Sequence, residues 1–351
     1  MANNHSPQNG VAVVMVPLPA QGHLNQLLHL SRLIAAVDNL TVYYAAAATF
    51  LRQAKLRAHH PSSIAAIKFH EFPDIPFHNP PPNANSSINF PSQIIPSLIA
   101  STNLRQPVYE FVNELSRSFR RVVVIYDSLM AYVVQDMDLI PNADFYRFRS
   151  ISAISVCSFE EEEAPDDDST AEILKEIPSM DGHYPPEFGE FLNLQSSASE
   201  IFSGEIYNSS GEIEGLFLDL LAKRNQEKKI WAIGPFNPVL KPENYNSKTH
   251  HELLDWLGKQ ELNSVIFISF GSTCSFSDEQ VKEIAFGNWA SRDELVSSVR
   301  VEKVVRKLMG SEEGDGIRKR AKELGDVVKK SLMEGGDTRK EMDSFITHIT
   351  R

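Results

Sequence analysis

Continuous apolar runs alternate with amphipathic stretches in the first half of the chain. Residues 11–16 form a valine-rich run, which is typical of a strand buried on both faces of a sheet. Leucine and isoleucine then recur at helical spacing between residues 24 and 37. The same patterns predict three more strands, at 40–47, 64–72 and 122–126, and helices at 50–58, 92–101 and 107–119. This alternation predicts an α/β fold with a parallel sheet between two layers of helices.

The pattern changes after residues 234–248, which contain three prolines and several asparagines. Such a composition is typical of an interdomain linker. Residues 264–270 predict one more buried strand, but residues 287–351 show only charged, amphipathic helical patterns. A lone strand cannot build a doubly wound sheet, because each parallel strand needs neighbours. We therefore predict an N-terminal domain, a linker and an incomplete C-terminal domain with C-terminal helices, at 1–235, 236–248 and 249–351.

Composition and charge restrict the class of protein. Hydrophobic residues make up 42% of the chain and charged residues 23%, as in globular proteins. A net charge of -12 argues against nucleic acid or an anionic membrane as a partner. The chain has two distant cysteines and no apolar run long enough for a membrane span, so we expect a cytoplasmic protein. The tandem histidines at 59–60 and 250–251 lack a third ligand nearby, so no metal is expected.

Two titratable residues follow predicted strands and are the candidates for catalysis. The turn 17–23 has the sequence PLPAQGH and places His23 after the first strand, at the start of the first helix. Ligands of open α/β sheets bind at that edge, and the helix N-terminus is expected to lower the pKa of the ring. Asp127 ends another strand, and a carboxylate there can fix the tautomer of a histidine base. The alternatives are a structural histidine and an aspartate that caps the following helix.

The segment 270–273, with the sequence FGST, is a turn of small residues between a predicted strand and a predicted helix. Its N–H groups and hydroxyls could hold a diphosphate, although such a turn is also an ordinary loop in most proteins. The sequence contains neither a G-x-G-x-x-G motif nor a Walker motif. Nothing in it therefore favours an NAD-binding or P-loop protein.

Four segments together resemble the plant UDP-dependent glycosyltransferase family. They read VVMVPLPAQGHLNQLLHLSRLIA, VVVIYDSLM, IWAIGPFNPV and LLDWLGKQELNSVIFISFGSTCSFSDEQVKEIAFG. The segment FHEFPDIPFHNPPPN and the tail MDSFITHIT are most similar to the branch that acts on zeatin-type cytokinins. The resemblance implies two Rossmann-like domains of the GT-B type, with the acceptor on the N-terminal domain and the UDP-sugar mainly on the C-terminal one.

The resemblance also implies roles for particular residues. His23 matches the general base that removes the proton of the acceptor hydroxyl, and Asp127 matches its carboxylate partner. The acceptor oxygen then attacks the anomeric carbon of the sugar, glucose or xylose, and inverts it. Donor-binding residues are expected at Gly22, Ser272 and Thr273. The UDP-sugar is a co-substrate, so no cofactor is expected.

The chain departs from the family where the donor should bind. The signature box that begins Trp-Ala-Pro-Gln and continues through His-Cys-Gly-Trp-Asn-Ser does not occur in it. The sequence is family-like up to Gly287 and resembles a region beyond the box from Asn288 onwards. This predicts an internal deletion on the order of a hundred residues and a weakened or lost donor site. Three interpretations stay open: a glycosyltransferase, a catalytically inactive relative that binds a small acceptor or a paralogue, and a rearranged or misread gene.

Overall fold

The computed structural model describes most of the chain in several segments. These are residues 8–58, 64–81, 90–159, 184–198, 202–236, 248–262 and 298–351, with isolated positions between 264 and 281. The chain divides into two compact units. The first unit contains residues 1–81, 88–238 and 331–351, and the second contains 82–87 and 239–330.

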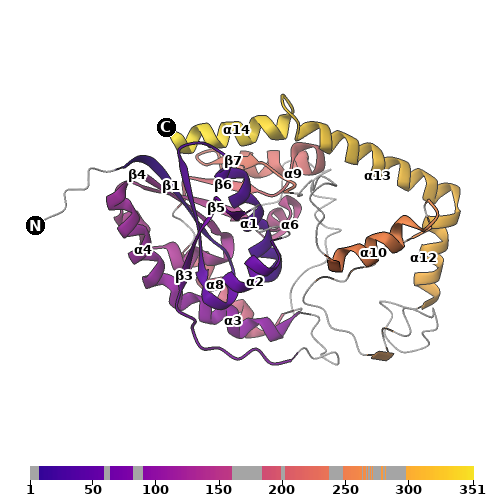
Figure 1. Ribbon diagram of the computed structural model, residues 1–351, viewed down its shortest axis with the longest axis horizontal. Coiled ribbons are helices and arrows are strands. Elements are labelled where there is room, and N and C mark those ends of the chain that lie inside the picture. Colours follow the sequence, from indigo (N-terminus) through magenta and orange to yellow (C-terminus); the bar gives the residue numbers. More distant parts are fainter. Residues whose placement is uncertain are drawn as a thin grey trace, which may run out of the picture. The chain divides into compact units, whose positions relative to one another are not determined.

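Seven parallel strands form one sheet in the described part of the first unit (Figure 1). Their order is β3-β2-β1-β4-β5-β6-β7. The strands are β1 (Gln8–Val16), β2 (Leu40–Ala47), β3 (Lys68–Phe72), β4 (Phe119–Asp127), β5 (Ala143–Arg149), β6 (Gly204–Tyr207) and β7 (Lys229–Ala232). The chain winds outward from β1 to one edge and then from β4 to the other, so the switch point lies between these two strands. Ligands of such sheets bind at the carboxyl ends of the strands beside the switch point.

Helices cover both faces of this sheet, as the sequence predicts. The described α-helices of the first unit are α1 (Gln21–Ala35), α2 (Ala48–Leu56), α3 (Ile95–Ser101), α4 (Arg105–Ser118), α5 (Ala131–Val134), α6 (Ala153–Phe159), α8 (Pro186–Ser197), α9 (Gly211–Arg224) and α14 (Asp337–Thr350). One core packs the sheet against α1, α2 and α14, and a second core packs it against α3, α4, α5 and α8. On α1 the buried positions follow the helical period: Leu24, Leu27, Leu28, Leu30, Ser31 and Ile34. Each large apolar side chain buried in this way contributes about 1.5–3 kcal/mol, which fixes α1 on the sheet.

The last helix of the chain belongs to the core of the first unit. Phe345 and Ile349 of α14 are fully buried. The ring of Phe345 lies 5.4 Å from that of Tyr146 on β5 and 5.2 Å from that of Trp231 on β7, in edge-on contacts. The predicted C-terminal region 249–351 is thus divided, because residues 331–351 cluster with the N-terminal sheet.

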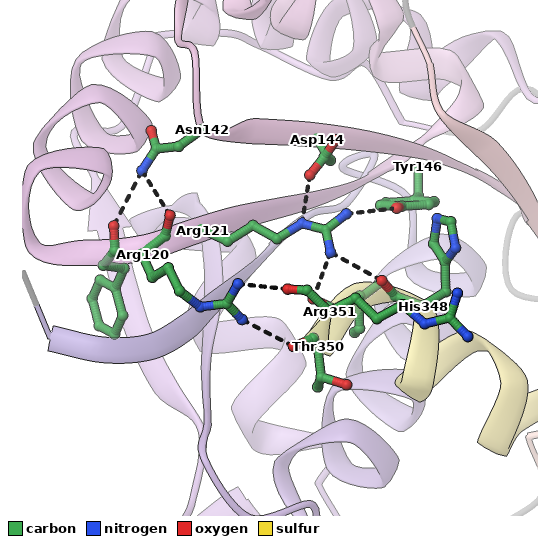
Figure 2. A network of polar contacts seen from close by, with 10 residues as sticks. Arg120, Arg121, Asn142, Asp144, Tyr146, His348, Thr350 and Arg351 are labelled. Carbon is green, nitrogen blue, oxygen red and sulfur yellow. Dashed lines mark hydrogen bonds and ion pairs between the residues drawn. The ribbon is translucent and has the colours of Figure 1, made fainter.

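Arg120 and Arg121, at the start of β4, hold the C-terminal end of α14 (Figure 2). Arg121 also pairs with Asp144 of β5, with an Nε–Oδ2 distance of 2.5 Å. Cations are favourable at a helix C-terminus, where carbonyl groups lack partners within the helix. Between them, Arg120 and Arg121 donate to the carbonyl oxygens of His348, Ile349, Thr350 and Arg351 at 2.5–3.0 Å.

In the second unit the structure describes three helices, which are α10 (Lys248–Gly258), α12 (Ser298–Gly310) and α13 (Glu312–Ser331). The strand predicted at 264–270 is not formed at the four positions described there, which are 264, 265, 267 and 269. The side chain of Phe267 is 88% exposed. No described strand of this unit offers a neighbour to pair with, and an unpaired strand is unfavourable in water.

Candidate functional site

His23 and Asp127 meet at the switch point of the sheet, although 104 residues separate them in the sequence. Asp127 is the last residue of β4, and His23 lies in the first turn of α1, which follows β1. The two strands are parallel neighbours with Val16 opposite Tyr126, so their carboxyl ends meet at one edge. Nδ1 of His23 lies 2.7 Å from Oδ2 of Asp127. The sequence-based prediction that the strand ends bring these two residues together is confirmed.

Asp127 has two partners, and both alternatives considered from the sequence are present at once. Its Oδ1 accepts a hydrogen bond from the backbone N–H of Leu129 at 3.0 Å, which caps a short 3-10 helix at Ser128–Met130. Its Oδ2 faces the imidazole. The side chain is fully buried, whereas 21% of the His23 side chain is exposed. The geometry therefore holds the carboxylate in place and leaves part of the imidazole open to solvent.

The charge of Asp127 controls the protonation of His23. Burial lowers the pKa of the His23 imidazole, but the negative charge of Asp127 and its hydrogen bond together outweigh burial and raise the pKa above 6.5. The prediction of a lowered pKa at this helix N-terminus is therefore wrong for the net shift. The full charge of a carboxylate at 2.7 Å outweighs the partial charge of a helix N-terminus. An ionised carboxylate only accepts, so the Nδ1 proton points to Asp127. Nε2 is then left to accept a proton from a substrate.

Tyr44 of β2 helps to fix the first turn of α1. Its hydroxyl donates to the backbone oxygen of Leu24 at 2.8 Å, directly after His23. Burial, and then the negative charge of Asp127, raise the pKa of the Tyr44 phenol well above 10. Tyr44 is therefore a neutral hydrogen-bond donor at working pH and holds the backbone next to the histidine.

Ser150 is a site residue that the sequence analysis missed. Its Oγ lies 2.8 Å from Nδ1 of His23. It directly follows β5, a strand that was not predicted because Arg147 and Arg149 interrupt its apolar pattern. Both arginines pair with Glu205 of β6 and are only 9% exposed. The aromatic-rich sequence DFYRFRS was the available signal of this strand.

The three predicted donor-binding residues have different outcomes. Gly22 lies in the first turn of α1 beside His23, is exposed, and has open space where a Cβ would be. The N-cap residue Ala20 makes no side-chain hydrogen bond, so no side chain caps the N–H groups of this turn. Ser272 and Thr273 lie outside the described residues.

An apolar groove lies on the same unit, between the segment after β3 and the helix α3. It has a volume of about 760 Å³. Ile75, Phe77 and Ala100 line both this groove and a narrow crevice of about 10 Å³, whose wall also includes Pro17 and Pro19 of the turn before His23. The groove thus connects, through shared lining residues, with the loop that carries the histidine. It is lined by Ile75, Pro76, Phe77, Ser92, Ile95, Pro96, Ile99, Ala100, Asn103, Pro185 and Glu187.

Neither a metal-binding cluster nor a membrane-spanning helix is found among the described residues. In the described part of the chain, no cluster of three or more His, Cys, Asp or Glu side chains has the geometry to hold a metal ion. Among the described helices, none is both long and apolar enough to span a membrane.

Comparisons with known proteins agree with this architecture. Residues 9–238 match the family described as the glycosyltransferase N-terminal domain. Zeatin O-glucosyltransferase of Phaseolus lunatus is 34% identical, with 97% of each chain covered. Zeatin O-xylosyltransferase of Phaseolus vulgaris is 33% identical, with 97% of this chain and 98% of the relative covered. Both alignments run over 451 positions, whereas this chain has 351 residues.

Solved structures share the fold. The UGT71G1 of Medicago truncatula in complex with UDP-glucose superposes with a TM-score of 0.68 at 18% identity, and 98% of this chain and 99% of that chain are covered. The UGT2 of Phytolacca americana, with UDP-2-fluoro-glucose and pterostilbene, gives a TM-score of 0.68 at 15% identity, with 98% and 100% covered. These similarities show that the chain has the GT-B type of fold.

Proposed function

The chain belongs to the plant UDP-dependent glycosyltransferase family, and we propose that it transfers a sugar to the hydroxyl of a small acceptor with His23 as general base. The observation that carries this proposal is the contact of 2.7 Å between Nδ1 of His23 and Oδ2 of the buried Asp127. A histidine whose Nδ1 is held by a carboxylate exposes Nε2 as the base. Asp127 raises the pKa of the His23 imidazole, which makes the unprotonated ring a stronger base.

In the proposed reaction Nε2 of His23 takes the proton of the acceptor hydroxyl as the acceptor oxygen attacks the anomeric carbon. The new carbon–oxygen bond forms on the face opposite UDP, so the sugar is inverted. The bond between the sugar and the diphosphate breaks, and UDP leaves with the electron pair. Asp127 stabilises the imidazolium that forms, because a charge-assisted hydrogen bond in a buried site is stronger than a neutral one.

We propose a zeatin-like, hydroxylated acceptor, because the relatives described above carry zeatin in their names. The apolar part of such a compound fits the groove beside α3. The hydroxyls of Ser97 and Ser101 in the crevice wall already donate to carbonyl oxygens of their own helix, at Ile94 and Leu98. The crevice therefore offers mainly apolar contact, which favours the apolar end of an acceptor and leaves its hydroxyl for His23.

The donor side is proposed to be reduced by an internal deletion. The alignments run over 451 positions against 351 residues, so at least 100 positions of each alignment have no residue of this chain. The sequence also lacks the Trp-Ala-Pro-Gln and His-Cys-Gly-Trp-Asn-Ser segments. Gly22, Ser272 and Thr273 remain as proposed donor contacts. Each lost charge-assisted hydrogen bond or stacking contact costs roughly 1–3 kcal/mol of donor affinity.

The same observation favours a second candidate function. If too few donor contacts remain, the chain binds the acceptor without transferring a sugar to it. The first unit carries the base and the apolar groove on its own sheet, so acceptor binding does not depend on the missing positions. The two candidates differ only in whether UDP-sugar binds and reacts.

Three measurements on the purified full chain separate these candidates. Product formation from zeatin with UDP-glucose or UDP-xylose is followed by mass spectrometry, and zeatin and UDP binding are measured separately by calorimetry. Glycoside formation that disappears in His23→Ala, but not in a His78→Ala control at an exposed loop position, supports the transferase. Zeatin binding without UDP binding or product supports the second candidate. Absence of both zeatin binding and product refutes the proposal.

A further inference from the structure

A row of polar groups begins at the pair His23 and Asp127 and runs along the carboxyl edge of the sheet. Asp127 ends β4, Ser150 follows β5, Asn208 follows β6 and Phe236 lies beyond β7. These four strands are consecutive neighbours in the sheet. The row therefore leads from the switch point to the place where the chain leaves the last strand.

The first link of this row is made by the hydroxyl of Ser150. It lies 2.8 Å from Nδ1 of His23, while Oδ2 of Asp127 lies 2.7 Å from the same nitrogen. Because Asp127 requires the proton on Nδ1, the Ser150 oxygen is a second acceptor of that N–H. Two acceptors on one N–H stabilise the imidazolium more than the neutral ring and restrict rotation of the ring.

Two side-chain amides continue the row. Gln26 lies one turn after His23 on α1, and its Nε2 donates to the backbone oxygen of Ser150 at 3.0 Å. Asn208 Nδ2 donates to Oε1 of Gln26 at 2.9 Å, and the backbone N–H of Phe236 donates to Oδ1 of Asn208 at 2.8 Å. A backbone oxygen at one end must accept and a backbone N–H at the other must donate, so both amide orientations are fixed.

Close packing holds the far end of the row. A Cβ at Gly234 would lie 2.4 Å from the carbonyl carbon of Asn208 and 2.5 Å from its Oδ1, so only glycine allows this approach. The ring of Phe236 is buried and stacks on Phe148 of β5 with a centroid distance of 6.0 Å. The segment 234–236 is therefore locked against the end of β6, and Asn208 is locked with it.

We propose that Ser150, Gln26 and Asn208 are positioning residues that hold the His23 ring and connect it to the segment 234–236. The role in catalysis rests on the proposed function of His23 as a base, but the hold on the ring does not. One hydrogen bond joins Nδ1 of His23 to Oγ of Ser150, and three more lead from the backbone oxygen of Ser150 through the two amides to the backbone N–H of Phe236. The base is thus fixed on one side by Asp127 and on the other by the segment through which the chain leaves the sheet.

The titration of His23 provides a readout that a merely structural role would not move. Among the described residues, Asp127 is the charged group that shifts the pKa of His23, and it also acts on the Tyr44 phenol, which stays neutral. Neither is changed in the variants below. Imidazole ¹⁵N spectra of the full chain between pH 5 and 9 report both the protonation and the tautomer of His23, and its signals are assigned by their loss in His23→Ala.

Ser150→Ala and Gln26→Met are compared with the wild type. Loss of the second acceptor, or of the amide that holds Ser150, is expected to move the titration midpoint of His23 to lower pH. Ser150→Thr, which keeps the hydroxyl, is expected to restore the wild-type midpoint. Gln106→Met on α4, where the amide donates to the exposed Glu110, is the matched control and should change nothing. Where turnover is measurable, kcat/KM of Gln26→Met should fall about tenfold to hundredfold, since small misplacements of a base are costly.

Unchanged titration and tautomer of His23 in both folded variants would overturn the inference, whatever the turnover. A shifted midpoint in a wild-type chain that forms no glycoside would support the positioning role and refute only the proposed transfer. If Gln26→Met does not fold, Ser150→Ala alone tests the inference. The side chain of Ser150 is partly exposed, so the loss of its hydroxyl leaves no large cavity.

Discussion

Asp127→Asn tests the electrostatic part of the site with little change of shape. The new side chain keeps an oxygen that accepts from the N–H of Leu129, as Oδ1 now does at 3.0 Å. Its amide group then occupies the position of Oδ2, 2.7 Å from Nδ1 of His23. An amide N–H donates, so the ring must present an unprotonated Nδ1 and carry its proton on Nε2. The base that would accept the acceptor proton is therefore blocked.

The size of the effect follows from the contact that is lost. A buried hydrogen bond to a charged group is worth about 1.5–3 kcal/mol, which corresponds to roughly tenfold to 150-fold in rate. The wrong tautomer adds to this, and in a serine protease triad the corresponding substitution lowers kcat about 10⁴-fold. We therefore expect kcat/KM for glycoside formation to fall at least about a hundredfold, with a smaller effect on acceptor affinity.

The same variant changes the pH dependence of stability. The pKa of His23 is raised above 6.5 in the folded chain, so the stability it contributes is complete below that pH and is lost as the pH rises through the folded pKa. Asp127→Asn removes this contribution. Urea unfolding should therefore show a larger loss of stability at pH 5.5 than at pH 9. The exposed Asp138→Asn on the same unit serves as the control.

Two results would refute this reasoning. Equal losses of stability at pH 5.5 and pH 9 would mean that Asp127 does not raise the pKa of His23. Full activity of Asp127→Asn, with the ¹⁵N signals of His23 still showing a proton on Nδ1, would mean that the carboxylate does not set the tautomer.

The remaining predictions concern stability and are measured by urea unfolding. Phe345→Ala should destabilise the first unit by about 3–5 kcal/mol, because the ring is fully buried between the sheet and α14; a small effect would mean that α14 does not pack there. Arg121→Ala should cost about 1–3 kcal/mol, because it removes the bonds to two carbonyls of α14 and to Asp144, and Arg121→Lys should recover part of it. Glu205→Gln should cost about 3 kcal/mol, because it removes the negative charge that pairs with the buried Arg147 and Arg149. Burial raises the pKa of Glu205, but Arg149 and Arg147 lower it below 4.5, so this cost should shrink as the pH falls through the folded pKa.

The two central strands, β1 and β4, can be predicted from the sequence because each has an uninterrupted apolar run of its own. Residues 11–16 and 122–126 lie in β1 and β4, the two central strands, and both runs are buried on both faces. β5 escapes prediction because two arginines stand in it, and the residue that neutralises them, Glu205, follows more than fifty residues later. β6 and β7 are only four residues long and carry charged residues, so their patterns are too short to stand out.

The residues of the site also divide into those that the sequence predicts and those that it does not. His23 and Asp127 are predictable because parallel strands bring their carboxyl ends together. Ser150 is not, because its position depends on β5. The packing of α14 is not predictable either, since an amphipathic pattern shows that one face is buried but not what covers it. Only the structure shows that Phe345 enters the core of the N-terminal sheet.

The measurement that tests the central claim most directly is the transfer of label from UDP-[¹⁴C]glucose or UDP-[¹⁴C]xylose to zeatin. If His23 is the base of a UDP-dependent transfer, the wild-type chain forms labelled, inverted glycoside and folded His23→Ala forms none, although it still binds zeatin. Equal transfer by both chains would contradict the role of His23, and no transfer by either would contradict the transferase itself.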